Sequence, residues 1–302
     1  MSLRSCFSGE RPVLSFELFP PRTEAGVRAL YRHVDRLMAH VPDFITCTYG
    51  AGGSTRNRTM EIVCAIKQRF RVPVASHLTL VDATRQDLAH YLAQARDNGV
   101  DHIVALRGDP PSGRSFFQAA AGGFSHANEL VTLIREEFPG FGVAVAGYPE
   151  THREAPGPEE DLRNLKRKVD AGADIIITQL FYNNDDFFDF RQRCRRAGIE
   201  VPIVPGILPV LSLQQVRKIA NLCGARLPAS FASRLQERPD DADWQLQVGI
   251  EHATRQVREL LESGIDGLHF YVLNKSESTN AILSSLENTG LQVPGRTRDD
   301  SV

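Results

Sequence analysis

The sequence predicts an α/β protein folded as a closed (β/α)8 barrel in a single domain. Eight apolar strand segments alternate with amphipathic helical segments along most of the 302 residues, and this alternation is typical of a parallel sheet covered by helices. The strands are apolar enough to be buried on both faces. A doubly wound open sheet is the alternative, but no strand leads into the Gly-x-Gly-x-x-Gly loop that such sheets usually carry.

The first strand sets the pattern. Residues 14–19 alternate between two faces and end abruptly at Pro20 and Pro21. Alternation places Glu17 on the same face as Ser15, opposite an apolar face. One carboxylate therefore lies on a strand surface that is otherwise small or apolar.

The remaining elements follow in order, separated by glycines, prolines and polar caps. Thr23 caps a helix that continues to about residue 39. The later strands are predicted at 43–49, 74–80, 102–107, 143–148, 174–182, 203–208 and 267–273. The later helices are predicted at 55–70, 83–98, 128–137, 158–171, 185–197, 213–222, 229–235, 243–262 and 279–286.

Two segments interrupt this regularity. Pro205 and Gly206 fall inside the predicted strand 203–208, where a proline is unfavourable for a central ladder. Residues 290–302 combine proline, glycine and mixed charges, and we expect a frayed tail there. The predicted barrel domain therefore covers residues 1–289.

Composition and charge limit the classes of function. Hydrophobic residues make up 42% and charged residues 24% of the chain, which is ordinary for a soluble globular protein. The net charge of -2 argues against nucleic acid and favours small-molecule partners. The five cysteines contain no Cys-x-x-Cys pair, so neither a disulfide framework nor a cysteine zinc site is predicted. Without a signal-like or membrane-spanning apolar run, we expect a cytoplasmic protein that makes no membrane contact.

Polar side chains gather at the carboxyl ends of the predicted strands, where the active sites of such barrels lie. An ionised Glu17 on its partly apolar strand is costly, so either a partner compensates the charge or its pKa rises and the group stays protonated. A salt bridge to Arg22 is the non-catalytic explanation. Asp109 follows the fourth strand, nearly opposite Glu17 in a closed ring, so we expect the two carboxylates to flank a flat ligand. The candidates are Glu17, Thr48, Tyr49, His77, Thr79, Arg107, Asp109, Tyr148, His152, Gln179, Asn274 and Lys275.

Each candidate also has a structural explanation. His77 alone is more often a core histidine than a ligand, Arg107 and Asp109 could form an ion pair at a turn, and Gln179 could cap backbone groups. The chain lacks the His-x-His pair of a binuclear metal hydrolase, so we expect no catalytic metal. A Schiff-base aldolase needs a lysine in the mouth, and only Lys275 remains. The residue types favour a cofactor-dependent reaction without specifying the cofactor.

Nine motifs then occur in order between residues 14 and 274. They are Ser15-Phe-Glu-Leu-Phe-Pro-Pro-Arg22, Thr48-Tyr-Gly-Ala51, His77-Leu-Thr79, Ala105-Leu-Arg-Gly-Asp109, Gly147-Tyr-Pro-Glu150, Asn164-Leu-Lys-Arg-Lys-Val-Asp-Ala-Gly-Ala173, Ile177-Thr-Gln179, Pro205-Gly-Ile-Leu-Pro209 and His269-Phe-Tyr-Val-Leu-Asn274. Together they resemble the 5,10-methylenetetrahydrofolate reductase family. The resemblance implies a (β/α)8 barrel that carries FAD, in agreement with the predicted architecture.

The resemblance also implies a reaction. NADH or NADPH reduces FAD and leaves, and methylenetetrahydrofolate then takes the hydride in the same place and departs as 5-methyltetrahydrofolate, a methyl source for methionine synthesis. Glu17 matches the family's acid, which protonates a folate nitrogen and must be a protonated carboxyl in the folate complex. Asp109 matches the family's aspartate beside flavin and pterin. We also expect a homo-oligomer.

Other positions match the family's binding residues. Gln179, Gln215 and Lys275 match folate contacts, together with Glu17 and Asp109. For Arg167 and Lys168, a solvated helix face is the alternative. The positions that match FAD contacts are Thr48, His77, Arg107, Gly108, Asp109, Ala127, Tyr148, His152, Asp161, Asn164, Arg167 and Lys168.

Three positions depart from the family pattern. Lys275 replaces an arginine of bacterial relatives, which exchanges a planar fork for a point charge at the folate carboxylate. Ile219 replaces an aromatic residue that stacks on substrate, and His126 replaces a tyrosine beside the flavin. These changes concern substrate affinity more than reaction type. We expect no feedback control by the eukaryotic regulatory domain. The functional alternatives are a non-catalytic flavin- or folate-binding barrel and a metal-dependent hydrolase.

Overall fold

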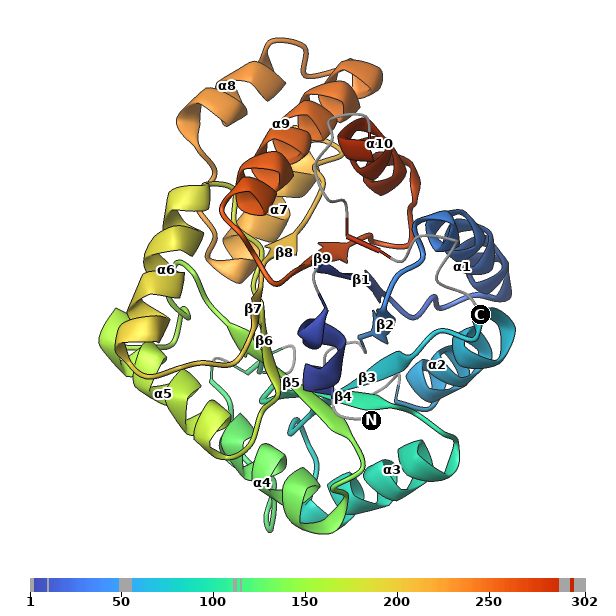
Figure 1. Ribbon diagram of the computed structural model, residues 1–302, viewed down its shortest axis with the longest axis vertical. Helices are drawn as coiled ribbons and strands as arrows, with labels where there is room; N and C mark the ends of the chain where they lie inside the picture. The colour runs from blue at the N-terminus through green and yellow to red at the C-terminus, as the bar shows by residue number, and fades with distance from the viewer. Residues whose placement is uncertain are drawn as a thin grey trace.

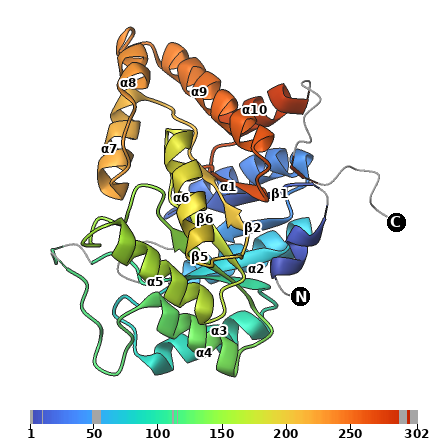
Figure 2. The same cartoon turned by 60° about the vertical axis from the view of Figure 1, so that its left-hand side comes forward.

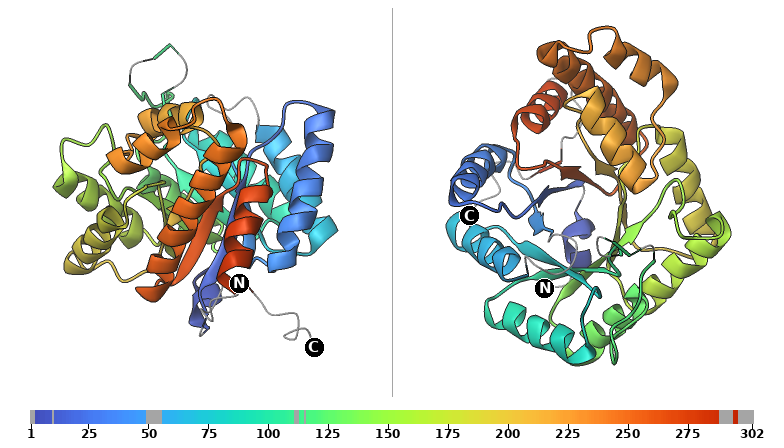
Figure 3. Two further views of the ribbon diagram at one scale, coloured as in Figure 1. Left: turned by 90° about the horizontal axis from the view of Figure 1, so that it is seen from above. Right: turned by 180° about the vertical axis from the view of Figure 1, so that it is seen from behind.

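Parallel strands form a closed barrel inside a ring of helices (Figure 1). The computed structural model describes residues 3–9, 11–48, 56–110, 113–114, 116–287 and 294–295. Within these residues one sheet has the order β7-β6-β5-β4-β3-β2-β1-β9-β8, and every neighbouring pair is parallel. The predicted TIM-type (β/α)8 barrel is therefore confirmed, and the open sheet is excluded. Viewed from above and from behind, the helices enclose the strands (Figure 3).

The elements agree with the predicted order, with boundaries that shift by a few residues. The strands are β1 (Val13–Leu18), β2 (Phe44–Cys47), β3 (Val74–Thr79), β4 (His102–Leu106), β5 (Gly142–Gly147), β6 (Ile175–Thr178), β7 (Ile203–Val204), β8 (Gly206–Ile207) and β9 (Gly267–Tyr271). The α-helices are α1 (Glu24–Leu37), α2 (Arg56–Phe70), α3 (Arg85–Asp97), α4 (Ala127–Glu137), α5 (Pro158–Asp170), α6 (Asn184–Arg196), α7 (Leu213–Cys223), α8 (Ala229–Gln236), α9 (Ala242–Glu262) and α10 (Glu277–Glu287). Tyr49, the glycine-rich loop 50–53, Thr55, Pro111 and most of the predicted tail lie outside the described residues.

The predicted strand 203–208 is divided in two at Pro205, and this division closes the barrel. β7 pairs with β6, whereas β8 pairs with β9. Proline has no N–H for the ladder, but its carbonyl accepts a hydrogen bond from the His269 N–H at 3.0 Å. The Gly206 N–H is satisfied by Thr178 Oγ1 at 2.9 Å. One short segment thus joins the two ends of the sheet.

Two predicted strands end earlier than expected. The strand predicted at 174–182 stops at Thr178, because the chain then leaves the sheet and buries Phe181 and Tyr182 against helices. The strand predicted to reach residue 273 stops at Tyr271. Leu273 and Asn274 adopt left-handed φ angles of 46° and 58°, which no strand accommodates.

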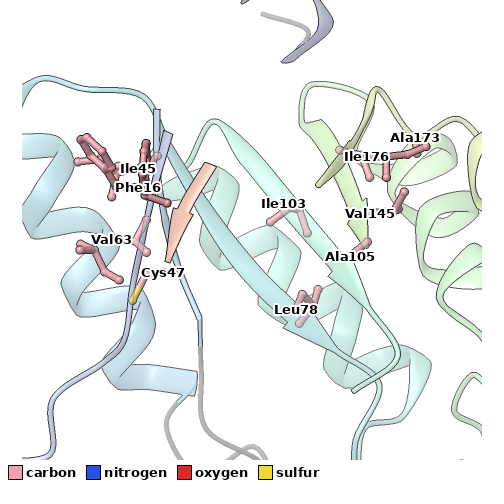
Figure 4. Close-up of a cluster of buried hydrophobic side chains, with 14 of the residues drawn as sticks. Phe16, Ile45, Cys47, Val63, Leu78, Ile103, Ala105, Val145, Ala173 and Ile176 are labelled. Atoms are coloured by element: carbon pink, nitrogen blue, oxygen red, sulfur yellow. The ribbon is translucent and has the colours of Figure 1, made fainter. Parts of the chain in front are cut away.

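The main core lies between the strands and the surrounding helices. Outward-facing side chains such as Phe16, Ile45 and Leu78 pack there against the helices (Figure 4). A second cluster joins α7, α8 and α9 to the segments that follow β6 and β8, and Figure 2 shows α7 and α8 standing beside α9 at one end of the molecule. Burial of these faces accounts for the helical periodicities seen in the sequence.

A separate cluster of apolar side chains fills the barrel interior at the amino ends of the strands. Leu3, in the 3-10 helix η1 (Leu3–Ser8), is fully buried and packs against inward-facing residues that include Phe44 and Val104. η1 lies in the centre of the ring in Figure 1. η1 was not among the elements expected from the sequence. It seals the amino ends of the strands, so the carboxyl ends remain for the functional site.

Candidate active site

Glu17 lies near the carboxyl end of β1 between two buried imidazoles. Its Oε2 is 3.3 Å from His77 Nε2 and 3.6 Å from His269 Nε2. The Glu17 side chain is 20% exposed, whereas those of His77 and His269 are 8% and 1% exposed. A partner therefore compensates the carboxylate, as one of the two predicted possibilities required. That partner is a pair of histidines, not Arg22.

The second possibility, a raised pKa of Glu17, is not met in this environment. Burial acts to raise the pKa of Glu17, but the charge interaction with His77 and the contacts with His269 outweigh it, so the pKa lies below its ordinary value. Burial lowers the pKa of His77, and the negative charge of Glu17 opposes that shift. Glu17 is consequently a carboxylate at neutral pH when the imidazoles are its only partners.

Three buried polar atoms near Glu17 have no hydrogen-bond partner within the described part of the chain. They are Thr46 Oγ1, His77 Nδ1 and His269 Nε2. Thr46 is paired with Glu17 in the β1–β2 register. Buried polar atoms are nearly always hydrogen-bonded in folded proteins, so this group marks a place where a ligand or water completes the bonding.

His269 is a site residue that the sequence reasoning missed. It was noted only as part of a motif, although strand alternation places it with Tyr271 on the inner face of β9. Its Nδ1 lies 2.8 Å from Ser15 Oγ. Its ring meets that of Tyr271 edge-on, at a centroid distance of 5.1 Å. The Tyr271 hydroxyl donates to the Thr178 carbonyl at 2.7 Å, which fixes the tyrosine beside β6.

Arg107 is held by a glutamate that was also missed. Its Nη1 and Nη2 contact the two carboxylate oxygens of Glu154 at 2.7 and 2.8 Å. The guanidinium also lies 5.0 Å from the centre of the Phe117 ring. Arg107 therefore forms an ion pair, as the structural alternative predicted, but its partner is Glu154 and not Asp109.

Asp109 follows β4, which is separated from β1 by β2 and β3 in the sheet, on a turn that requires glycine. Gly108 has a φ of +87°, and a Cβ there would come within 2.6 Å of Val81 Cγ2. Asp109 is exposed, and its charge adds to burial in raising the pKa of Tyr148. The ring of Tyr148 meets the ring of His152 edge-on, at 4.6 Å between centroids. These two rings and Asp109 form a second polar group at the mouth.

The predicted site residues on α5 have partners within the protein. Asp161 Oδ2 accepts from the His152 N–H at 2.9 Å, and Asn164 Oδ1 accepts from Arg167 at 2.7 Å. Arg167 is 61% exposed, in line with the solvated-face alternative. Lys168 is different, since its ammonium donates to the Ala146 carbonyl at 2.5 Å and burial lowers its pKa to about 8.

The predicted folate contacts lie on three separate segments. Gln179 Oε1 accepts from the Leu180 N–H at 2.9 Å, so its amide caps backbone in this state. Gln215 is half-buried in the first turn of α7, and Lys275 is exposed beyond β9. Ile219 packs against the cluster formed by α7, α8 and α9.

Asn274 has a structural part in the site. Its Oδ1 accepts from the Phe19 N–H at 2.9 Å and its Nδ2 donates to the Phe19 carbonyl at 2.6 Å. These bonds hold the segments that leave β1 and β9 together. The exposed side chains of Phe19 and Leu273, at 44% and 37%, give this side of the rim an apolar edge.

The other predicted cofactor contacts are placed by backbone structure. Thr48 directly follows β2, and its carbonyl accepts from Thr59 Oγ1 at 3.0 Å. Ala127 is the first residue of α4, after the N-cap His126. Among the described residues, no three or more His, Cys, Asp or Glu side chains cluster in a way that could hold a metal ion. In the same residues, no helix combines the length and apolar character needed to cross a membrane.

Comparison with known proteins identifies the family. The family described as Methylenetetrahydrofolate reductase matches residues 2–287. The chain is 42% identical to 5,10-methylenetetrahydrofolate reductase of Escherichia coli K12, with 90% of each chain covered. It is 41% identical to methylenetetrahydrofolate reductase (NADH) 1 of Arabidopsis thaliana, with 94% of this chain but 50% of the plant protein covered. The chain thus spans about half the length of the plant relatives it matches.

A solved structure shares the fold at low sequence identity. It is an uncharacterised protein from Clostridium thermocellum that binds two copies of 5-methyl-5,6,7,8-tetrahydrofolic acid. Its TM-score is 0.64 at 14% identity, with 96% of this chain and 100% of that chain covered. With a family match over nearly the whole sequence and a bacterial relative of similar length, the chain belongs to the methylenetetrahydrofolate reductase family.

Proposed function

We propose that this protein is an FAD-dependent oxidoreductase that reduces 5,10-methylenetetrahydrofolate to 5-methyltetrahydrofolate with NADH or NADPH. Family membership supports the folate substrate and the reduction. The names of the plant relatives include NADH, which supports a nicotinamide donor. The observation that carries the proposal is Glu17, held between two buried imidazoles at the position of the family's acid.

The residues at the mouth fit a flavin. His77 Nδ1 is buried and has no hydrogen-bond partner within the described residues, so it is available to a ligand. At the N-terminus of α4 the Glu129 carboxylate accepts from the Ser125 and His126 N–H groups, and the N–H groups of Ala127 and Asn128 are those suited to a phosphate. Arg107 could neutralise a pyrophosphate if Glu154, which is 40% exposed, gave way. When bound, FAD would accept hydride from the nicotinamide and donate it to the folate.

The protein's own part in the reaction is positioning and proton transfer. Glu17 would give a proton to a folate nitrogen, which opens the five-membered ring to an iminium that accepts hydride. General acid catalysis by such a group typically contributes about 10²- to 10⁴-fold. Asp109 would keep a negative charge beside the flavin and pterin. Nicotinamide and folate would use the same mouth in turn, and the product would supply methyl groups for methionine synthesis.

A two-step absorbance experiment tests the proposal. Purified protein should be yellow, should bleach on addition of NADH or NADPH without oxygen, and should recover its flavin absorption on addition of methylenetetrahydrofolate. A colourless protein that reconstitutes no FAD would refute the proposal. A protein that binds flavin but is bleached by neither nicotinamide would instead favour the non-catalytic binding barrel.

A further inference from the structure

The last turn of α7 is held by an arginine from another part of the chain. α7 has no basic residue in its own last turn, although a cation is favourable at the carboxyl end of a helix. Arg153, in the segment between β5 and α5, supplies this charge. Its Nη1 donates to the Asn221 and Leu222 carbonyls at 3.1 and 3.0 Å. The last carbonyls of a helix lack N–H partners within it, so Arg153 satisfies two groups that need an outside donor.

The end of α7 is shaped to receive this side chain. Gly224 ends the helix with a left-handed φ of 75°. A Cβ at this position would lie 2.7 Å from Arg153 Cγ and 3.1 Å from its Cδ. The arginine stem therefore packs directly against the glycine backbone, in space that a larger residue would fill. Although Arg153 is exposed, two hydrogen bonds and this packing fix its position.

A second arginine fastens the chain that follows α7 to the same segment. The Arg226 N–H donates to Glu150 Oε2 at 2.8 Å, and its Nε contacts the same oxygen at 3.1 Å. Its Nη2 also donates to Asp186 in the first turn of α6. Arg226 is largely exposed, but the Glu150 and Asp186 side chains are only 8% and 15% exposed. Glu150 and Arg153 are three positions apart, so one short segment holds the end of α7 through two contacts.

One face of this helix borders the mouth of the barrel. Gln215, Ile219 and Cys223 follow one another at four-residue spacing, which places them on one side of α7. Burial raises the pKa of Cys223 to about 11, and the negative charges of Asp109 and Glu17 act in the same direction. Cys223 is therefore close enough to both carboxylates of the candidate site to be affected by them. The face that also carries Gln215 and Ile219 is thus turned toward the proposed folate site.

The other end of α7 is fixed separately, since the Leu213 N–H donates to Gln245 Oε1 of α9 at 2.6 Å. We propose that Arg153 is a positioning residue that seats the last turn of α7 and thereby sets the place of Ile219 and Gln215 for the folate. This inference rests on the proposed function. Without Arg153, the helix would keep its attachment to α9 and swing at its carboxyl end. Ile219 lies nearer to the released end than Gln215, so its displacement would be larger.

Replacement of Arg153 by Met tests this role in the flavin-loaded protein. In stopped-flow oxidation of the reduced flavin, the methylenetetrahydrofolate concentration that gives half the maximal rate should rise about three- to tenfold, the change expected for loss of one contact. The maximal rate should change less than about twofold, because Glu17 and the flavin site are untouched. Arg153→Lys keeps a cation and an aliphatic stem over Gly224. It should bring the half-saturating concentration back to within about twofold of the unmodified protein.

A double substitution tests whether the effect passes through Ile219. In protein that carries Ile219→Ala, the further change Arg153→Met should raise the half-saturating concentration less than about twofold, because residues that act together are not additive. Arg69→Met is the matched control. It removes an arginine that is 51% exposed and pairs with Asp35, between α2 and α1, and it should leave the half-saturating concentration unchanged.

Hydrogen exchange followed by mass spectrometry reports on the helix without any substrate. Amides of residues 220–225 should exchange faster in Arg153→Met than in the unmodified protein or in Arg69→Met. Unchanged exchange in Arg153→Met would overturn the inference, as would an unchanged half-saturating concentration or an equal rise with and without Ile219→Ala. If the unmodified protein reduces no folate, the proposed function fails, whereas hydrogen exchange still decides whether Arg153 seats α7.

Discussion

Replacement of Glu17 by Gln should separate the two halves of the proposed reaction. The amide has the shape of the carboxyl group and fits between His77 and His269, which lie 3.3 and 3.6 Å from Oε2. It cannot pass a proton to the folate nitrogen. Loss of a general acid costs about 10² to 10⁴ in rate, or about 3 to 5 kcal/mol of transition-state stabilisation. Reduction of the flavin by NADH or NADPH needs no acid at this position and should change less than about twofold.

Anaerobic stopped-flow absorbance measures the two steps separately. The flavin band is followed first during mixing with the nicotinamide and then, after its reduction, during mixing with methylenetetrahydrofolate. Glu277→Gln is the matched control, because it makes the same chemical change at a carboxylate that is 53% exposed outside the mouth. Equal losses in both steps would show that Glu17 supports structure. An undiminished folate step would show that the proton comes from another group.

Three other predictions follow from contacts in the barrel. Glu154→Gln removes the carboxylate that pairs with the Arg107 guanidinium and should tighten FAD binding several-fold in a flavin-release titration. Weaker FAD binding in this variant would mean that Glu154 itself supports the cofactor. Lys168 has a pKa of about 8 in the folded protein and about 10.4 in the unfolded chain. Between these two pH values the unfolded chain binds more protons than the folded protein, so the free energy of unfolding rises with pH. In urea unfolding between pH 8 and 10.5, the free energy of unfolding of the protein should therefore rise by about 1 to 3 kcal/mol relative to that of Lys168→Met. A difference between the two proteins that stays constant over this pH range would contradict the prediction. Leu3→Ala leaves a cavity beneath the strands and should lower the free energy of unfolding by about 2 to 3 kcal/mol. If the denaturant midpoint of the variant equals that of the native sequence, this prediction is wrong.

The fold was predictable because its signals are local. Strand and helix periodicities located every long element, and Thr23 begins α1 as a cap that accepts from the Gly26 N–H. The division at Pro205 was visible as a disturbance, but its role in joining β6 to β9 depends on two different partners that no local pattern specifies. η1 was missed because its six residues are too few for the spacing of Leu3, Cys6 and Phe7 to indicate a helix.

The site was predictable in position but not in pairing. Alternation correctly placed Glu17 on an inner face, yet the suggested partner, Arg22, was the nearest cation in sequence. The observed partners, His77 and His269, are contributed by β3 and β9, and only barrel closure brings them to β1. Arg107 and Glu154 are likewise separated by 47 positions. Strand periodicity predicts which way a side chain points, whereas its partner depends on the register of the closed sheet.

The lowered pKa of Glu17 and its proposed role as an acid are compatible if the group gains a proton when the folate is bound. A carboxyl group isolated in an apolar pocket keeps its proton because ionisation is costly there, and the same cost opposes the carboxylate left after delivery. Beside the imidazoles the carboxylate is stabilised, so it is a better product of proton transfer. The protonated form that delivers the proton is then scarce at neutral pH. His77 and His269, whose Nε2 atoms lie 3.3 and 3.6 Å from Glu17 Oε2, are the imidazoles that stabilise the carboxylate. Folate binding must therefore offset the stabilisation that these imidazoles give the carboxylate before Glu17 can act as the acid.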